Sequence, residues 1–109
     1  MTRALFICSH NKLRGPAAAK VFASWPGVET DSAGLNAEGA LGLRPEQLAW
    51  ADIVFVMQTE HRARLIRNFS AYLQDKRVIC LNVRETYGSM QPALVNRLEA
   101  KAGPFLKRL

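Results

Sequence analysis

The chain has few cysteines, no long hydrophobic run and no grouping of His, Cys, Asp and Glu at metal-ligand spacing. Two cysteines, Cys8 and Cys80, cannot make the disulfide framework of a small secreted domain, and they suit a reducing cytosol. No apolar stretch approaches the about 20 residues of a membrane-spanning helix, because Asp52 interrupts the longest candidate. The apolar stretch near Met1 is too short for a signal peptide. We therefore expect a cytoplasmic protein without a membrane segment, metal or cofactor.

The composition does supply a core, since 49% of the residues are hydrophobic. A length of 109 residues predicts a single domain over 1–109. The net charge of +6 raises the question of a nucleic-acid partner, but the basic residues are scattered and do not alternate with aromatic ones. We therefore favour a small anionic substrate or an acidic partner, with an ordinary basic surface as the simplest alternative. The sequence does not indicate an oligomeric state.

Strand and helix patterns alternate along the chain. Short apolar runs predict strands at 3–8, 28–33, 53–57 and 77–82. Helical spacing predicts helices at 16–25, 45–51, 58–73 and 92–101, with Gly103-Pro104 ending the last one. The alternation predicts the α/β class, as a three-layer α/β/α sandwich with a four-stranded parallel sheet. Ligands of such sheets bind at the carboxyl ends of the strands.

The third helical pattern is amphipathic, with one apolar and one charged face. The side chains expected to face the core are Leu65, Ile66, Phe69, Tyr72 and Leu73. His61 opens this helix and is expected at the surface. Cys80, in the fourth apolar run, is expected to be a core residue.

A polar loop, Cys8-Ser9-His10-Asn11-Lys12-Leu13-Arg14, joins the first strand to the helix that begins near Pro16. A Cys and an Arg at this spacing are a weak signal alone, and a buried Cys8 that merely ends a strand is the plain alternative. However, backbone N–H groups and the helix N-terminus converge at such a junction, which suits a phosphate. Arg14 would clamp two phosphate oxygens with its planar guanidinium, and the positive field favours a nucleophilic thiolate at Cys8. Asn11 tolerates the left-handed backbone that turns such a loop.

The segment L-F-I-C-S-H-N-K-L-R-G-P at 5–16 resembles the low-molecular-weight protein tyrosine phosphatase family, whose signature is V-C-x-x-N-x-x-R-S-P. Two further segments, D-S-A-G at 31–34 and A-D-I-V-F-V-M at 51–57, resemble the family's S-A-G and A-D-x-I-x-x-M. The similarity is closest to a short bacterial branch of predicted tyrosine phosphatases. It implies a phosphotyrosine protein phosphatase I-like fold. It also implies hydrolysis of a phosphomonoester, phosphotyrosine in particular, through a phosphocysteine intermediate on Cys8, with Arg14 holding the equatorial oxygens.

The same resemblance implies that the polar loop is the phosphate-binding segment. It leaves the role of His10 in this loop open. The implied binding residues are Ser9, His10, Asn11, Lys12, Leu13 and Arg14. His10 is a candidate to tune Cys8 or to contact the substrate, and the alternative is a residue that faces solvent. Leu13 stands where the family has a second cysteine, which removes the family's protective disulfide with Cys8.

The general acid is expected in the loop after the fourth strand, and there the chain departs from the family. Asn82 and Gln91 are amides at two positions of expected carboxylates, and an amide cannot donate the required proton. Glu85 is the one carboxylate in this loop and is the candidate acid, against the alternative of an exposed surface charge. Tyr87 is a candidate to stack on an aromatic substrate or, alternatively, a packing residue.

Gly15 is the other departure, because the family has Ser or Thr directly after the arginine. The resemblance implies that the missing hydroxyl stabilises the departing thiolate. Gly15 therefore predicts slow breakdown of the phosphocysteine. Together with the amides, it leaves open an alternative function: a catalytically weak or inactive relative that binds phosphorylated or acidic partners through the retained loop.

Overall fold

Strands and helices alternate along the chain in the computed structural model of the protein, which describes residues 1–36, 39, 42–83 and 91–107. The strands are β1 (Thr2–Cys8), β2 (Val28–Gly34), β3 (Ile53–Val56) and β4 (Arg77–Cys80). The helices are α1 (Arg14–Ala23), α2 (Pro45–Trp50), α3 (Thr59–Phe69) and α4 (Pro92–Leu106), and a 3-10 turn, η2 (Ser70–Tyr72), follows α3. The predicted alternation is confirmed.

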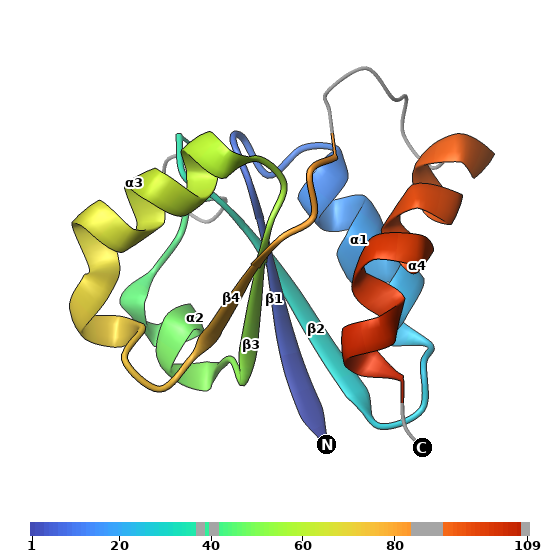
Figure 1. Ribbon diagram of the computed structural model, residues 1–109, viewed down its shortest axis with the longest axis horizontal. Helices are drawn as coiled ribbons and strands as arrows, with labels where there is room; N and C mark the ends of the chain where they lie inside the picture. Colours follow the sequence, from blue (N-terminus) through green and yellow to red (C-terminus); the bar gives the residue numbers. More distant parts are fainter. Residues whose placement is uncertain (37–38, 40–41, 84–90, 108–109) are drawn as a thin grey trace.

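The four strands form one parallel sheet in the order β2-β1-β3-β4. In the register of this sheet, Ile7 of β1 lies between Ala33 of β2 and Val56 of β3. Helices α1 and α4 cover one face and α2 and α3 the other (Figure 1). The predicted three-layer sandwich is therefore confirmed, with β1 at an interior position of the sheet.

Side chains of β1 alternate between two cores, as successive residues of a strand must. Ala4, Phe6 and Cys8 face the core under α1 and α4, and Phe6 stacks on the Phe22 ring of α1 with centroids 5.6 Å apart. Leu5 and Ile7 face the other core, which α2 and α3 close. Both faces are buried, which is why this strand reads as a continuous apolar run.

Helix α1 differs from the prediction at both ends. It begins at Arg14, two residues before Pro16, and this is possible because a proline in the first turn removes an N–H that has no helical partner in any case. It ends at Ala23, so Trp25 lies beyond the helix. Trp25 packs edge-on against Phe22 instead, with centroids 4.7 Å apart.

Helix α4 was predicted to end before Gly103-Pro104, and this prediction is wrong. The helix continues to Leu106, whose side chain is buried with that of Ala102 against the sheet. The Lys107 backbone N–H donates to the Gly103 carbonyl at 2.8 Å, which closes the final turn. Burial of this apolar face outweighs the local preference of glycine and proline for ending a helix.

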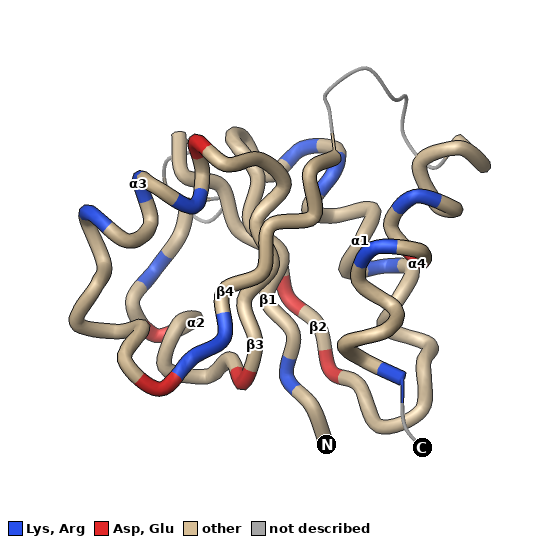
Figure 2. The backbone as a smooth tube through the Cα atoms, viewed as in Figure 1, with Lys and Arg blue, Asp and Glu red and all other residues tan. Residues whose placement is uncertain are grey.

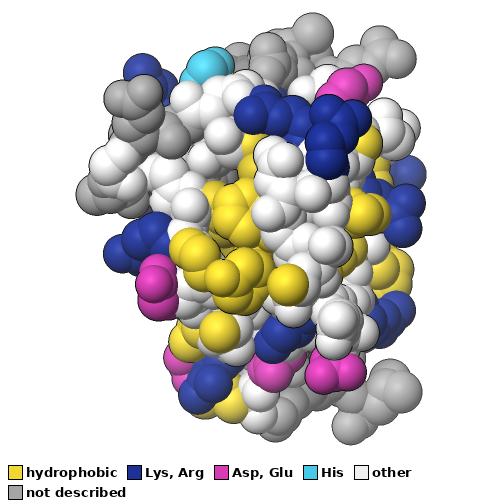
Figure 3. Space-filling model, turned by 90° about the vertical axis from the view of Figure 1, so that its left-hand side faces the viewer, with side chains coloured by type: hydrophobic (Ala, Val, Ile, Leu, Met, Phe, Trp, Pro, Cys, Tyr) yellow, Lys and Arg dark blue, Asp and Glu magenta, His cyan; other side chains and the backbone are white. Residues whose placement is uncertain are grey.

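The predicted apolar face of α3 is partly wrong. Leu65 is buried, and Phe69 and Leu73 pack against the core of that side. Ile66 and Tyr72 are 44% and 46% exposed. Ile66 follows the buried Leu65 by one residue, about 100° around the helix, and so lies off the core-facing side. Tyr72 is exposed because α3 ends at Phe69 and the 3-10 turn takes it out of the helical period. The face formed by α2 and α3 accordingly mixes hydrophobic and basic side chains (Figure 3).

Lys and Arg residues are spread over the backbone rather than gathered on one side of the molecule (Figure 2). They occur on α1, α3 and α4, in the loop between β1 and α1, and on the strands. Within the described ranges, no helix has the length and apolar character needed to cross a membrane.

Candidate active site

Cys8 ends β1, and the alternation of that strand directs its side chain toward α1. The thiol is buried, and the Cys8 carbonyl accepts a hydrogen bond from the Leu35 backbone N–H at 2.9 Å. A Cβ atom placed on Gly15 would lie only 3.1 Å from Cys8 Sγ. The absence of a side chain at Gly15 thus brings the first turn of α1 directly against the thiol.

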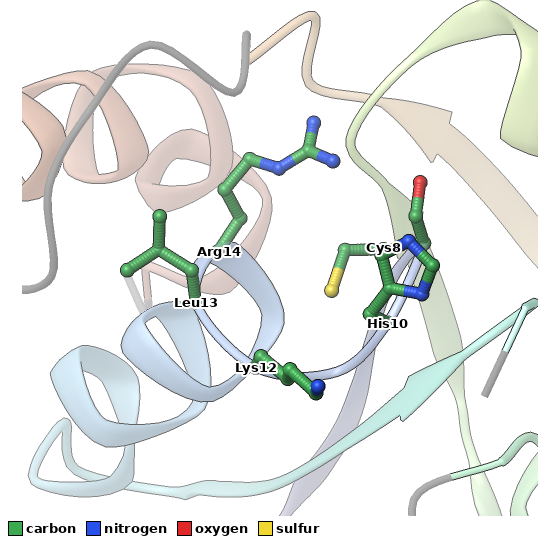
Figure 4. Close-up of a pocket in the computed structure, with 6 residues that line it drawn as sticks. Cys8, His10, Lys12, Leu13 and Arg14 are labelled. Carbon is green, nitrogen blue, oxygen red and sulfur yellow. The ribbon is translucent and has the colours of Figure 1, made fainter. Parts of the chain in front are cut away.

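The segment between Cys8 and Arg14 forms the wall of a cavity of about 230 Å³. Its lining residues are Cys8, Ser9, His10, Lys12, Leu13 and Arg14. The loop curves around the cavity, with Cys8 and Arg14 on opposite sides of it (Figure 4). His10 and Lys12 are exposed. The structure therefore brings together all but one of the predicted loop residues around one small cavity.

Asn11 is the loop residue that does not line the cavity; it turns the backbone, with a φ of 55°. Its Nδ2 donates to the Ser32 carbonyl of β2 at 3.4 Å, and the residue is buried. This is the left-handed conformation that the sequence led us to expect, since asparagine adopts it more readily than most residues. The turn returns the chain to α1, whose first turn contains no acidic residue. The N–H groups and dipole of this helix end therefore face the loop without a competing carboxylate from their own turn.

Arg14 is 3% exposed, and hydrogen bonds hold its guanidinium in place. Its Nη1 donates to the Val83 carbonyl at 2.8 Å and to Gln58 Oε1 at 3.0 Å. Gln58 follows β3 and caps α3, whereas Val83 follows β4. Two neighbouring strands thus orient the guanidinium from the carboxyl edge of the sheet.

His61 contacts the first residue of this loop, and the prediction that it lies at the surface is wrong. It is 5% exposed, and its Nε2 lies 2.8 Å from Ser9 Oγ. The position in the first turn of α3 places it beside the carboxyl edge of β3. Sequence reasoning missed His61, Gln58 and Val83. The signal that could have found them is that each follows a strand within a few residues, at the ligand-binding edge of a parallel sheet.

Glu85 and Tyr87, the candidate acid and stacking residue, lie outside the described residues. On either side of that segment, Asn82 is exposed with a φ of 56°, and Gln91 caps α4. β4 ends at Cys80, two residues earlier than predicted. Among the residues that the structure does describe, no three His, Cys, Asp or Glu side chains are grouped so as to hold a metal ion.

Cys80 is half-buried and cannot pair with Cys8 in this fold. In the sheet register, Ile7 pairs with Val56 and Val56 with Cys80, so the two cysteines lie about two strand spacings, ~9.6 Å, apart or more. A disulfide needs Cα atoms within about 7 Å. Both thiols are free, and Cys80 packs at the margin of the core under α2 and α3.

Solved structures of several phosphatases are similar to this chain. The YwlE arginine phosphatase from Geobacillus stearothermophilus is 23% identical over 96% of this chain and 95% of that one, with a TM-score of 0.68. A low-molecular-weight protein tyrosine phosphatase from T. tengcongensis is 22% identical over 94% of each chain, with a TM-score of 0.72. The tyrosine phosphatase Wzb from Escherichia coli K30, in complex with phosphate, is 15% identical over 94% of each chain, also with a TM-score of 0.72. No protein-family model and no curated protein matches the sequence.

The fold is therefore that of the low-molecular-weight protein tyrosine phosphatases, as the resemblance in the sequence implied. The match extends over nearly the whole of both chains in each comparison. The structure thus combines this fold with a cysteine, an arginine and a helix N-terminus that surround one cavity.

Proposed function

We propose that the protein hydrolyses phosphomonoesters at the loop between Cys8 and Arg14. The observation that carries the proposal is the position of the buried Cys8 thiol at a small cavity, across from Arg14 and against the N-terminus of α1. This arrangement joins a nucleophile to a cationic anion site. The similar solved structures support it, since they are described as tyrosine and arginine phosphatases and one contains phosphate.

The reaction proceeds in two displacements at phosphorus. The Cys8 thiolate attacks, an S–P bond forms, and the bond to the leaving-group oxygen breaks while a general acid protonates that oxygen. Water then attacks the phosphocysteine, breaks the S–P bond and releases inorganic phosphate and the Cys8 thiolate. Arg14 and the loop N–H groups stabilise the equatorial oxygens in both steps.

Glu85 is proposed as the general acid. The support is its tether to Val83, whose carbonyl accepts the 2.8 Å hydrogen bond from Arg14. Glu85 follows Val83 by two positions and is the carboxylate nearest to it in the sequence. We expect Glu85→Gln to slow release of a poor leaving group far more than release of an activated phenol, because an activated phenolate leaves without protonation.

Phosphotyrosine is the proposed natural substrate class, with Tyr87 as a residue that stacks on its ring. Because the similar structures include an arginine phosphatase, a phosphotyrosine peptide should be assayed beside the same peptide carrying phosphoarginine. We expect the larger kcat/KM for phosphotyrosine. The reverse preference would retain hydrolysis at Cys8 and overturn the substrate assignment.

Turnover of an aryl phosphate by three proteins tests the proposal. The wild type and Cys80→Ser should release the phenol at equal rates, whereas Cys8→Ser should release none. Cys80→Ser is the matched control because it removes the second thiol, which lies away from the cavity.

Two other results would separate the remaining alternatives. Equal activity of the wild type and Cys8→Ser would overturn the nucleophile assignment. A wild type that binds phosphate and never releases phenol would instead favour a protein that acts by binding.

A further inference from the structure

Ser9 connects the phosphate-binding loop to α3, on the opposite side of the sheet from α1. Cys8 points toward α1, so strand alternation turns the next side chain toward α3. There Ser9 Oγ meets His61 Nε2 at 2.8 Å. His61 is 5% exposed and Ser9 is half-buried, so this contact at the first residue of the loop is partly shielded from water.

The hydrogen bonds of His61 define which nitrogen carries the proton. The backbone N–H of Gln58 donates to Nδ1, with the two nitrogens 3.3 Å apart. Nδ1 therefore presents its lone pair, and in the neutral imidazole the hydrogen is on Nε2. His61 thus donates to Ser9 Oγ, while Gln58 holds the ring in the required orientation.

The same turn of α3 also contacts the other end of the loop. Gln58, whose N–H orients the imidazole, accepts the hydrogen bond from Arg14 Nη1 at 3.0 Å through its side chain. Ser9 and Arg14 are the first and last residues of the segment that follows Cys8. The N-terminal turn of α3 therefore holds both ends of a loop whose middle turns through the left-handed Asn11.

We propose that His61 is a positioning residue: by donating to Ser9, it keeps the loop in its anion-binding shape before any ligand arrives. If the loop already has its bound conformation, no free energy of binding is spent on shifting it from other conformations, and the affinity for the anion is higher. The consequence for phosphate binding and turnover rests on the proposed function, whereas the effect on the loop itself does not.

A simpler role for His61 is to cap α3 through the Gln58 N–H alone, and variants of the two partners separate these roles. Ser9→Ala removes the acceptor and leaves the contact between His61 and Gln58 intact. His61→Met removes both nitrogens at similar side-chain length, and His61→Gln restores an N–H donor. Ser70→Ala, at an exposed serine that follows α3, is the matched control for loss of a hydroxyl.

Amide hydrogen exchange, measured on the full chain without ligand, reads the loop shape directly. We expect residues 9–14 to exchange about fivefold faster in Ser9→Ala and in His61→Met, the change that corresponds to one buried hydrogen bond. The double variant should exchange no faster than either single one, because all three lack the same interaction. The His61→Gln and Ser70→Ala variants should match the wild type. Exchange in β1 reports global unfolding and should not change.

Binding of inorganic phosphate provides the second readout, with the same variants expected to weaken the dissociation constant about fivefold. If amide exchange in residues 9–14 became faster in His61→Met but did not change in Ser9→Ala, the proposal would be overturned. His61 would then act only as the cap of α3. The proposal would also be overturned if the acceleration of exchange in the double variant equalled the product of the accelerations in the two single variants. If the wild type neither binds phosphate nor hydrolyses an aryl phosphate, the proposed function fails, while the exchange measurements still decide whether His61 positions the loop.

Discussion

At the scale of a single residue, Gly15 determines how α1 meets the thiol. Its missing Cβ atom would lie 3.1 Å from Cys8 Sγ and 3.3 Å from the Phe6 carbonyl oxygen. These distances are shorter than ordinary van der Waals contacts, so a side chain would fit only after a shift of a few tenths of an ångström. A hydroxyl on that side chain would nevertheless stand beside the sulfur and could donate to its thiolate.

We expect Gly15→Ser to raise the turnover of an aryl phosphate. The added hydroxyl stabilises the thiolate as it leaves phosphorus, which speeds breakdown of the phosphocysteine. Gly15→Ala is the control, since it adds the same Cβ atom without a donor and should not raise the rate. Steady-state kcat with an activated aryl phosphate is the measurement. A Gly15→Ser rate equal to or below that of the wild type would contradict this role.

Arg14 provides a second expectation at this scale. Its guanidinium is oriented by Val83 and Gln58 through Nη1, and a lysine ammonium cannot reproduce that planar geometry. We expect Arg14→Lys to lower kcat/KM for an aryl phosphate by about 100-fold, which is typical for loss of a preorganised donor to a developing anion. A loss of less than about threefold would contradict the assignment, because so small a change fits a surface cation.

At the scale of the element, only a narrow stripe of side chains on α3 faces the core. Leu65 and Ile66 are adjacent, yet Leu65 is fully buried and Ile66 is 44% exposed. We expect Leu65→Ala to lower the free energy of unfolding by about 2–5 kcal/mol and Ile66→Ala by less than about 1 kcal/mol. Urea denaturation of both variants measures this difference. Equal losses would contradict the orientation of α3.

The sequence predicted elements well where periodicity alone defines them and poorly where tertiary contacts decide. The strand β3 is buried on both faces, so its run of apolar residues was sufficient to predict it. The prediction for α4 was wrong at Gly103-Pro104, because the burial of Ala102 and Leu106 is not visible from local propensity. The prediction for Tyr72 was wrong because the 3-10 turn after Phe69 breaks a spacing that looked helical.

At the scale of the whole molecule, the contiguous part of the site was predictable and the assembled part was not. The residues from Cys8 to Arg14 are consecutive, so one strand-loop-helix pattern was enough to find them. Gln58, His61 and Val83 follow two other strands and hydrogen-bond to Ser9 or Arg14 of this loop, and the strand order β2-β1-β3-β4 brings them beside it. The sequence alone predicts that residues after the strands meet at the carboxyl edge of the sheet. It does not predict which of them form hydrogen bonds with each other.

The charge of the molecule also carries an expectation. The net charge is +6, but the described Lys and Arg residues are scattered along the backbone rather than gathered in one region (Figure 2). We expect any binding to duplex DNA to be weak at low salt and to disappear near 0.15 M salt, a concentration of about physiological strength. Titrations of the wild type and Cys8→Ser at several salt concentrations measure this. Tight binding that persists at physiological salt in both proteins would instead indicate a nucleic-acid partner.

The central claim is that Cys8 carries the phosphoryl group during turnover. Mass spectrometry of protein denatured rapidly during reaction with an aryl phosphate tests it directly, on the tryptic peptide from Ala4 to Lys12. We expect this peptide to gain the mass of one phosphoryl group in the wild type and in Cys80→Ser, with a matching burst of released phenol, because Gly15 leaves breakdown as the slow step. Turnover without phosphorylation of that peptide, or turnover that persists in Cys8→Ser, would contradict the claim.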